Sequence, residues 1–507
     1  MQLIEKALQE NKTSIMLVPE ISLTPQTVDR FLSRFGEEKI AVLHSKLSVG
    51  ERYDQWNKIK SGKAKVVIGA RSAIFAPVQD LGLIIIDEEH DSSYKSEMSP
   101  KYQAKEVARY LAKENNIPLV LGSATPDLGS YYQAEKQNTT LLTLSKRANH
   151  ANLPTVTIVD LRKELASGNK TMISGELQEA IQYNLDHKQQ TILFLNRRGF
   201  STFVMCRDCG YTAKCKNCDI TLTYHASDNK LKCHYCGYET KMLTNCPECH
   251  SSHIRYFGAG TQKLEQQIHS LFPTAKTIRM DVDTVNKKNS HEEILNQFKN
   301  DDIDILIGTQ MVVKGHHFPK VTLVGVIAAD SSLNIEDFRA NEKTFQILTQ
   351  VAGRAGREEN MAGRVMIQTY NPDNFSIECA QKQDYYLFYK TELSIRKQLK
   401  YPPFCDIIMI SVSSKQKETA LKITNQLHAY LKKRVLQENW KIILYNGVPA
   451  PIDKIKNQYR YRMIIKCQFN DKIMELINSV LAQYETMQES KNSDNRVNID
   501  LNPNNMF

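Results

Sequence analysis

Eight of the eleven cysteines of this 507-residue chain stand in four C-x-x-C pairs within one short stretch. A tight turn at each pair can aim two thiolates at one metal ion, and tetrahedral zinc takes four such ligands. The sequence therefore predicts two zinc ions rather than a disulfide framework, which is unusual in a large chain without a secretory signal. The predicted ligands are Cys206, Cys209, Cys215, Cys218, Cys233, Cys236, Cys246 and Cys249.

Two arrangements of the four pairs are compatible with the intervals of 5, 14 and 9 residues between them. In a nested arrangement the two middle pairs hold an inner ion, and the first and last pairs hold an outer one. In a sequential arrangement the first pair joins the second, and the third joins the fourth. The stretch contains few apolar residues, so we expect the metals to take the place of a hydrophobic core.

Two adjacent carboxylates, Asp87 and Glu88, follow an apolar run that ends at Ile86. In nucleotide hydrolysis the first carboxylate of such a pair would hold Mg²⁺, and the second would orient or deprotonate the attacking water. An acidic pair after a strand can equally be a solvated loop, because acidic strand ends are common in doubly wound folds.

A second candidate for nucleotide chemistry is the segment 350–357, which reads QVAGRAGR. If this segment is helical, Gln350, Arg354 and Arg357 share one face. Converging arginines suit a phosphoryl group, and the two glycines would let a second backbone approach closely. A basic solvated helix is the alternative, but each glycine would cost such a helix about 1 kcal/mol.

The elements that must position these residues read as strands, each nearly all apolar and followed by a polar turn and a helical stretch. This pattern is typical of a parallel sheet covered on both faces, with the polar strand ends forming a site. It predicts an α/β fold with two lobes, separated by a polar linker at 149–171, and with the cysteine stretch inserted in the second lobe. The expected strands are 13–18, 40–43, 65–68, 83–86 and 118–121, then 191–195, 277–280, 304–307 and 321–327.

The C-terminal part reads as a separate α+β domain, with strands at 407–412 and 463–467 and a helix at 417–436. The segment Tyr459–Arg462 interleaves aromatic and cationic side chains, as nucleic-acid-binding surfaces do. A half-buried strand with a solvated basic face fits the same alternation. The polar tail at 486–507 gives no structural signal.

The composition is that of an ordinary globular protein, with 41% hydrophobic and 24% charged residues. The net charge of +10 suits a polyanionic partner, and half of the excess lies in residues 401–507, which carry 15 Lys and Arg against 10 Asp and Glu. Apolar runs are far shorter than the roughly 20 residues of a membrane span. Without a targeting pattern, and with free cysteines beside zinc thiolates, the chain is expected in the reducing cytoplasm.

Taken together, several motifs carry a resemblance to known helicases. DEEH at 87–90, SAT at 123–125 and QxxGRxGR at 350–357 resemble motifs of the superfamily 2 DNA and RNA motors. The four C-x-x-C pairs make the chain resemble, more closely, the bacterial replication restart helicases of the primosomal protein N-prime family. Further segments similar to that family are VPEISLTPQT (18–27), VIGARSAIF (67–75), DEEHDSSYK (87–95), LFLNRRGF (193–200) and ILIGTQMVVKGHHFP (305–319).

The resemblance implies two RecA-like parallel-sheet lobes, a two-zinc insertion in the second lobe with nested pairing, and a C-terminal α+β domain. It also implies an ATP-dependent 3′-to-5′ DNA helicase that recognises stalled or abandoned replication forks and initiates primosome assembly. ATP, Mg²⁺ and two Zn²⁺ would be its cofactors. Its partners would be forked and single-stranded DNA, single-stranded-DNA-binding protein and primosome or helicase-loading proteins, without a membrane. The expected domains are 1–148 (first lobe), 149–202 with 258–370 (second lobe), 203–257 (zinc insertion), 371–400 (helical connector) and 401–507 (C-terminal domain).

The resemblance also carries over to single residues. Asp87 and Glu88, with Gln350, Arg354 and Arg357, would bind and hydrolyse ATP. Tyr94 lies in the loop 91–102, which in the family senses DNA and couples it to hydrolysis. The DNA-binding residues implied in this way are Pro19, Thr24, His44, Ser45, Arg71, Ser72, Tyr94, Thr309 and Gln310.

One motif of such motors, the phosphate-binding loop G-x-x-x-x-G-K-[ST], does not occur among the 507 residues. The only Gly-Lys, Gly62–Lys63, is followed by Ala64 and has Asn57 where the first glycine would stand. We therefore expect that the chain begins inside the first lobe, without the family's N-terminal DNA-binding region, and that it has little ATPase activity alone.

Two other functions compete with the helicase. One is a catalytically impaired fragment that binds DNA and recruits partners, which the missing loop favours. The intact Asp87, Glu88, Arg354 and Arg357 favour the helicase, since a module that only binds has no use for them. The other is an RNA helicase, which leaves the eight cysteines unexplained.

Overall fold

The computed structural model describes residues 1–19, 25–45, 47–144, 153–195, 203–225, 228–256, 260–281, 290–300, 303–309, 318–356 and 363–506. These residues form two compact units, one made chiefly of residues 1–142 and the other of residues 143–507. Among the described residues, no helix combines the length and the apolar character that a membrane crossing requires.

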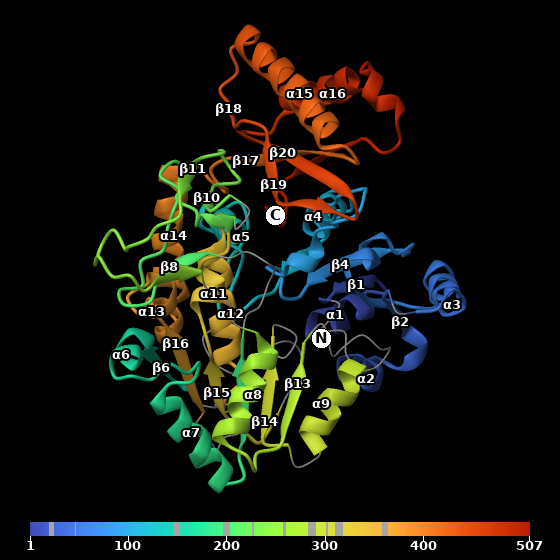
Figure 1. Ribbon diagram of the computed structural model, residues 1–507. Coiled ribbons are helices and arrows are strands. Elements are labelled where there is room, and N and C mark those ends of the chain that lie inside the picture. The colour runs from blue at the N-terminus through green and yellow to red at the C-terminus, as the bar shows by residue number, and fades with distance from the viewer. Residues whose placement is uncertain are drawn as a thin grey trace. The chain divides into compact units, whose positions relative to one another are not determined.

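The first unit is built on a parallel sheet of five strands in the order β2-β3-β1-β4-β5 (Figure 1). Successive side chains of β1 serve opposite faces, because Ile15 and Leu17 join one core cluster and Met16 packs against another. The strands are β1 (Thr13–Leu17), β2 (Ile40–Leu43), β3 (Val66–Gly69), β4 (Leu81–Ile86) and β5 (Leu119–Leu121). The helices are α1 (Gln2–Gln9), α2 (Pro25–Phe35), α3 (Val49–Lys60), α4 (Ala104–Glu114) and α5 (Leu128–Glu135).

The second unit contains a parallel sheet of six strands in the order β13-β14-β7-β15-β16-β6. Its strands are β6 (Thr155–Asp160), β7 (Gln190–Phe194), β13 (Thr277–Met280), β14 (Ile305–Gly308), β15 (Val321–Val326) and β16 (Arg364–Thr369). Its helices are α6 (Leu161–Ala166), α7 (Gly175–Asp186), α8 (Thr261–Leu271), α9 (Ser290–Asn300), α11 (Asp330–Leu333) and α12 (Ala340–Ala352). The expected linker at 149–171 is therefore wrong in part, because it contains β6 and α6. β6 is an edge strand whose side chains alternate in exposure, which gives it a polar composition.

The cysteine stretch leaves the six-stranded sheet after β7 and returns to it before α8, which confirms the insertion. It forms one two-stranded and one three-stranded antiparallel sheet. The expectation that metals replace a hydrophobic core is wrong in part. Leu231 and Tyr235 pack with buried cysteines, and Tyr401, Ile407 and Ile464 from the C-terminal part complete this core. The strands are β8 (Val204–Cys206), β9 (Thr223–His225), β10 (Lys230–Lys232), β11 (Glu239–Lys241) and β12 (Ile254–Tyr256).

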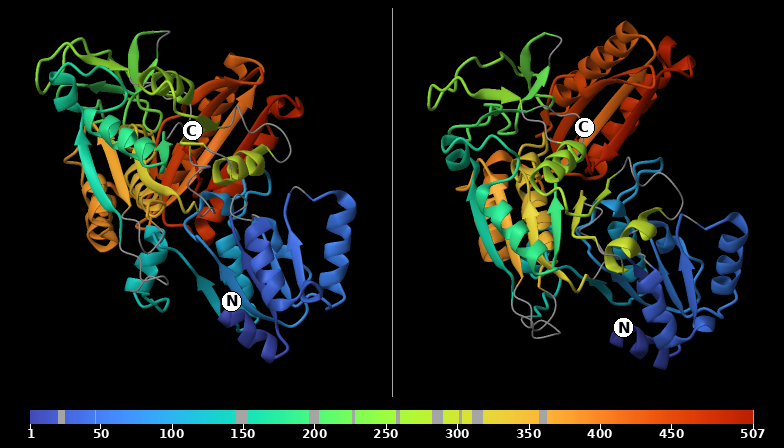
Figure 2. Two further views of the ribbon diagram at one scale, coloured as in Figure 1. Left: turned by 90° about the horizontal axis from the view of Figure 1, so that it is seen from below. Right: turned by 60° about the horizontal axis from the view of Figure 1, so that its bottom comes forward.

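The C-terminal part begins with the expected helical hairpin, α13 (Phe375–Lys382) and α14 (Tyr385–Leu399), and continues as an antiparallel sheet. Helices α15 (Lys417–Gln437) and α16 (Asp471–Glu485) lie together on one side of this sheet (Figures 1 and 2). The tail does have structure, because β21 (Arg496–Leu501) pairs with β17. The remaining strands are β17 (Asp406–Ser414), β18 (Ile443–Leu444), β19 (Val448–Ile455) and β20 (Gln458–Cys467). The predicted fold class, with its two parallel sheets and its C-terminal α+β domain, is confirmed.

Candidate functional site

All four C-x-x-C pairs fold into the same turn. In the first, the N–H of Cys206 donates to the carbonyl of Tyr211 at 2.8 Å, and the N–H of Gly210 donates to the carbonyl of Cys206 at 2.9 Å. The same two bonds recur at the other three pairs. The residue four positions after the first cysteine always has a positive φ, a conformation that glycine, asparagine, aspartate and histidine tolerate best. These residues are Gly210 (81°), Asp219 (53°), Gly237 (79°) and His250 (59°).

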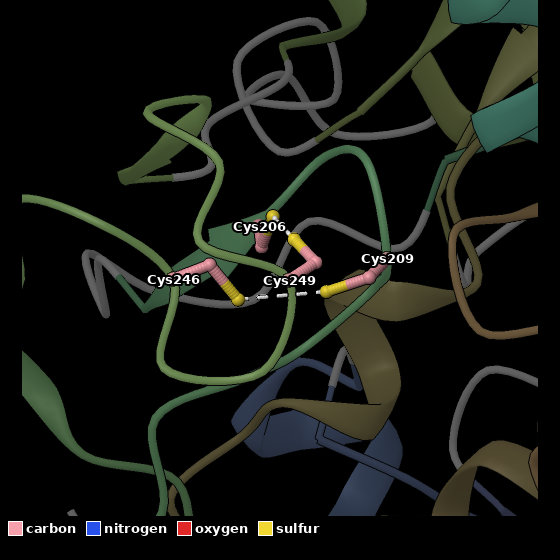
Figure 3. Close-up of side chains that lie close together, drawn as sticks. All are labelled: Cys206, Cys209, Cys246 and Cys249. Carbon is pink, nitrogen blue, oxygen red and sulfur yellow. Dashed lines mark hydrogen bonds between the residues drawn. The ribbon is translucent and has the colours of Figure 1, made fainter.

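The outer cluster consists of Cys206, Cys209, Cys246 and Cys249, whose side chains converge (Figure 3). The sulfur of Cys206 lies 3.6 Å from that of Cys249, and the sulfurs of Cys209 and Cys246 are 3.5 Å apart. Four sulfurs at about 2.3 Å from one zinc ion would stand about 3.8 Å from each other, so the donor set fits tetrahedral zinc. Three of the four cysteines are at least partly buried, whereas Cys249 is exposed.

The inner cluster consists of Cys215, Cys218, Cys233 and Cys236, with the sulfurs of Cys215 and Cys236 3.6 Å apart. Its first three cysteines are buried. The pairing is therefore nested, as the family resemblance implies, and the sequential arrangement is wrong. Both clusters present four thiolates and no other ligand type, which is the donor set of a structural zinc site without an open position.

Gly210 offers a direct test of how the outer turn is held. It combines a positive φ with a close approach, since an added Cβ would stand 2.2 Å from the carbonyl oxygen of Tyr370. Gly210→Ala is expected to speed release of the outer zinc to a chelator and to lower the unfolding temperature. Gly168→Ala is the matched control, because Gly168 has a φ of 94° with nothing within 4 Å of the added Cβ. If Gly210→Ala released zinc no faster than Gly168→Ala, neither the positive φ of Gly210 nor its contact with Tyr370 would hold the outer turn.

In the first unit, most of the predicted nucleotide and DNA residues lie along one edge of the sheet. Because the five strands are parallel, their carboxyl ends meet at the same edge. The residues within four positions of a strand end include Pro19 after β1, His44 and Ser45 after β2, Arg71 and Ser72 after β3, Asp87 and Glu88 after β4, and 122–125 after β5. Thr24 lies outside the described residues.

Asp87 is fixed at this edge by its backbone, because its N–H donates to the carbonyl of Leu17 at 2.9 Å. Its side chain is exposed to solvent, yet the surrounding protein desolvates the carboxyl enough to raise its pKa above the usual range. The N–H of Glu88 donates to Asp87 Oδ1 at 3.0 Å, and this hydrogen bond lowers the pKa of Asp87 and so partly offsets the effect of burial. Glu88 itself has a φ of 46°, so the chain turns sharply between the two carboxylates and the following residues.

Two further residues of this motif, Glu89 and His90, connect it to other elements, which the sequence did not predict. The carboxylate of the buried Glu89 accepts from Lys105 Nζ at 2.7 Å, from Ser130 Oγ at 2.9 Å and from the N–H of Asp127 at 2.7 Å. His90 Nδ1 lies 2.7 Å from Ser123 Oγ, which joins the acidic motif to the segment 123–125.

The ion pair of Lys105 and Glu89 is almost completely buried. Burial opposes the charge of Lys105, but Asp127 and Glu89 outweigh it and raise the pKa of the ammonium group. Sequence alone gave no signal for this lysine, because it lies 16 residues after its partner on another element.

The expectation that Tyr94 contacts DNA is wrong, because Tyr94 has no exposed surface. Its hydroxyl donates to the carbonyl of Asp87 at 2.6 Å, and its ring belongs to the core of the first unit. Arg71 holds the same loop, donating from Nη1 to the carbonyls of Ser93 at 3.1 Å and Lys95 at 2.6 Å. A contact between Arg71 and DNA stays a prediction.

Tyr94→Phe tests whether Tyr94 stabilises the fold or binds DNA. The variant should keep the affinity for single-stranded DNA, because a buried ring cannot contact a base. It should lose about 1 kcal/mol of stability, since the carbonyl of Asp87 loses a neutral hydrogen bond. Fluorescence anisotropy with a labelled oligonucleotide and urea unfolding measure the two quantities. A large loss of DNA affinity at unchanged stability would contradict the buried position.

In the second unit, helix α12 ends at Ala352, so the helix that would have placed Gln350 and Arg354 on one face does not extend to Arg354. Gly353 caps the helix, and Gly356 turns the chain with a φ of 61° while its N–H donates to the carbonyl of Val321 at 3.3 Å. The glycines thus end a helix and bring the chain against β15, rather than weaken a continuous helix. Arg357 and Gln310 lie outside the described residues, and Thr309 directly follows β14.

The expected basic face at Tyr459–Arg462 is wrong for its last residue. Arg462 is only 2% exposed, and its guanidinium donates to a backbone carbonyl of the cysteine stretch, that of His234. Tyr461 is buried as well, and Arg460 is half-exposed. This strand therefore joins two parts of the protein, and Arg462 is not available to nucleic acid.

Four protein-family models match the chain. DEAD/DEAH box helicase matches residues 1–133, and the helicase conserved C-terminal domain matches residues 242–359. The PriA DNA helicase Cys-rich region domain matches residues 215–241, and the primosomal protein N C-terminal domain matches residues 397–504. The matches follow the order in which the sheets and the cysteine stretch occur along the chain.

Several curated relatives are similar over nearly the whole chain. The replication restart protein PriA of Bacillus subtilis is 48% identical over 503 residues, which are 99% of this chain and 62% of that protein. The protein of the same name from Treponema pallidum is 39% identical over 95% of this chain and 71% of its own length, and that of Synechocystis is 43% identical over 92% and 57%. The chain thus spans about three-fifths of the length of the first of these relatives.

Proposed function

Because the chain belongs to the family of the replication restart protein PriA, we propose that it carries the motor, zinc and C-terminal parts of an ATP-dependent DNA helicase. The helicase would move 3′ to 5′, recognise stalled or abandoned replication forks and initiate primosome assembly. It would work in the bacterial cytoplasm, at the nucleoid. The observation that supports this most directly is the sheet edge of the first unit, where an acidic pair and a row of polar strand ends meet.

The acidic pair would serve the nucleotide. Asp87 would hold the Mg²⁺ of Mg-ATP, and Glu88 would orient or deprotonate the attacking water. Gln350, Arg354 and Arg357 would contact the phosphates, as an arginine finger does. The contact between His90 and Ser123 supports a coupling function, because it links the acidic residues to the segment after β5 and could carry a change at the nucleotide to the rest of the edge.

The remaining strand ends would contact single-stranded DNA. Short polar side chains and backbone amides suit phosphates and carry no sequence information, as a motor that must pass any sequence requires. Besides DNA, the partners would be single-stranded-DNA-binding protein and helicase-loading proteins of the primosome. The proposed DNA contacts are Pro19, Thr24, His44, Ser45, Arg71, Ser72, Thr309 and Gln310.

The two cysteine clusters would each hold one Zn²⁺. Zinc would crosslink two turns at each site and so fix the short strands of the cysteine stretch. The residues around the clusters would then present a rigid surface to the fork.

Unwinding of forked DNA tests the proposal. The 507 residues contain no phosphate-binding loop, so the assay compares the chain with an extended version, to which a segment carrying such a loop has been joined at the N-terminus. The extended version should unwind forks that carry a 3′ single-stranded tail and spare those with only a 5′ tail. The 507-residue chain should hydrolyse ATP at less than about a tenth of the extended rate, because phosphate binding is lost.

Two outcomes would contradict the proposal. Unwinding from 5′ tails alone would reverse the polarity. DNA binding without hydrolysis in the extended version would favour a non-catalytic module that binds forks and recruits partners.

A further inference from the structure

The peptide groups on both sides of His234 are held by charged side chains from two other parts of the second unit. The N–H of His234 donates to Glu336 Oε1 at 2.7 Å. Its carbonyl accepts from Arg462 Nε at 3.0 Å and from Nη2 at 2.8 Å. Glu336 lies in the segment between α11 and α12, whereas Arg462 is on β20 of the C-terminal sheet. We call Glu336, His234 and Arg462 the His234 clamp.

Both charged side chains of the clamp are almost completely buried, with exposed fractions of 1% for Glu336 and 2% for Arg462. A buried charge is costly unless hydrogen bonds compensate it. Here the compensating groups come from the cysteine stretch: Thr223 Oγ1 donates to Glu336 Oε2 at 2.9 Å, and the guanidinium lies 5.7 Å from the centre of the Tyr235 ring. The two charges therefore depend on the fold of this stretch.

The other turn of the inner cluster, between Cys215 and Cys218, is also held by residues from outside the cysteine stretch. The hydroxyl of Tyr401 donates to the carbonyl of Cys218 at 3.2 Å. The Tyr401 ring stacks on Phe338, with centroids 4.7 Å apart and planes 3° from parallel, and Lys466 Nζ lies 3.5 Å from the centre of the Tyr401 ring. Phe338 is two residues after Glu336, and Lys466 is on the strand of Arg462. This turn is thus connected through Tyr401 to the same two parts of the protein that hold His234.

We propose that Glu336 and Arg462 are positioning residues of the inner zinc site, and that this site in turn joins the C-terminal sheet to the segment between α11 and α12. The clamp fixes the turn between Cys233 and Cys236 only while the turn is folded, and zinc keeps it folded. Without metal the His234 backbone moves, and a buried carboxylate and a buried guanidinium lose their partners. Occupancy of the inner cluster and docking of the C-terminal sheet are therefore coupled.

The outer cluster does not take part in this coupling. The contacts around its first turn are to the segment after β16, where Gly210 approaches the carbonyl of Tyr370 and Asn371. Its last turn is bonded to its first, since Ser251 Oγ donates to Asp208 Oδ2 at 2.6 Å. The two zinc sites, equal in ligand type, thus differ in what they hold together.

Zinc release to a colorimetric chelator tests the positioning residue. In the intact 507-residue chain we expect two phases, and Cys249→Ser identifies the one that belongs to the exposed outer site. Arg462→Met should speed the inner phase about tenfold or more, since a charged hydrogen-bond pair is lost, and leave the outer phase unchanged. Arg460→Met, on the same strand and half-exposed, is the matched control. If Arg462→Met fails to fold, Arg462→Lys is the alternative. Lysine keeps the positive charge but has one donor nitrogen instead of the two that bond His234, so the inner phase should be accelerated less.

Hydrogen exchange tests the coupling in the other direction. Cys215→Ser, which disables the inner site, should speed exchange in β20 and in residues 334–338 at least severalfold, whereas Cys249→Ser should not. Unchanged exchange in β20 after loss of the inner zinc would overturn the proposal, as would equal inner release from Arg462→Met and Arg460→Met. Neither experiment uses nucleotide or DNA, so failure here leaves the helicase proposal intact, and failure of the helicase proposal leaves the clamp intact.

Discussion

Glu88→Gln is expected to lower DNA-stimulated ATP hydrolysis by about 10²–10⁴-fold in a version of the chain that carries a phosphate-binding loop. The amide keeps the size of the side chain but cannot take a proton from the attacking water. Asp87 keeps its place, because it is its backbone N–H that bonds to Leu17. Steady-state hydrolysis with saturating single-stranded DNA measures the effect.

The control for this variant is Glu38→Gln, an exposed carboxylate of the same unit, far along the chain from the acidic motif. It should hydrolyse ATP at the unaltered rate. Both variants should bind single-stranded DNA as the parent does, since neither side chain is among the proposed DNA contacts. A loss of less than about tenfold in Glu88→Gln would exclude it as the general base.

Arg396→Met is expected to destabilise the second unit by about 3–5 kcal/mol. The guanidinium donates from Nε to Glu392 at 2.9 Å and from Nη2 to Glu342 at 2.7 Å, and all three side chains are buried. Burial opposes its charge, but the two carboxylates raise the pKa of the guanidinium. Methionine fills a similar volume and leaves two buried carboxylates without their cation, which is the costly way to break such a network.

Urea unfolding followed by far-UV circular dichroism measures this loss, with Arg434→Met as the matched control. Arg434 lies in the same unit and faces Glu438 at 3.6 Å, but the two side chains are 36% and 46% exposed. Such a surface pair contributes at most about 1 kcal/mol, so the control should stay close to the parent. If the two variants unfold alike, the buried network contributes no more than a surface pair.

The strands and the metal ligands could be predicted because each depends on neighbours in the sequence. Ile84 and Ile86 stand in an apolar run that only a sheet covered on both faces can bury, and β4 ends one residue before the acidic pair, as expected. Two cysteines with two residues between them can both bind one metal ion through a single tight turn. The sequence also contains a signal for the turn conformation, because Gly210 and Gly237 each stand four positions after the first cysteine of their pair.

What the sequence could not give depends on contacts between distant parts. Tyr94 and Arg462 are of residue types that often bind nucleic acid at a surface, yet both are buried. Tyr94 packs in the core of the first unit and bonds the carbonyl of Asp87, and Arg462 bonds the carbonyl of His234. β21 was missed because its side chains are largely polar on one face, and only the pairing with β17 makes it a strand. Helix α12 ends at Ala352, although the spacing of the residues that follow is also compatible with a longer helix.

The nested pairing of the clusters also sets an order of assembly. Closing the outer cluster in a free chain means bringing together cysteines separated by the 36 residues between Cys209 and Cys246. Once the inner cluster is closed, only the intervals of 5 and 9 residues remain free, which lowers the entropic cost of closure by about 0.8 kcal/mol. Closing the inner cluster brings together cysteines separated by only 14 residues, whether or not the outer cluster is closed. The entropic cost of closure therefore favours binding of zinc at the inner site before the outer one.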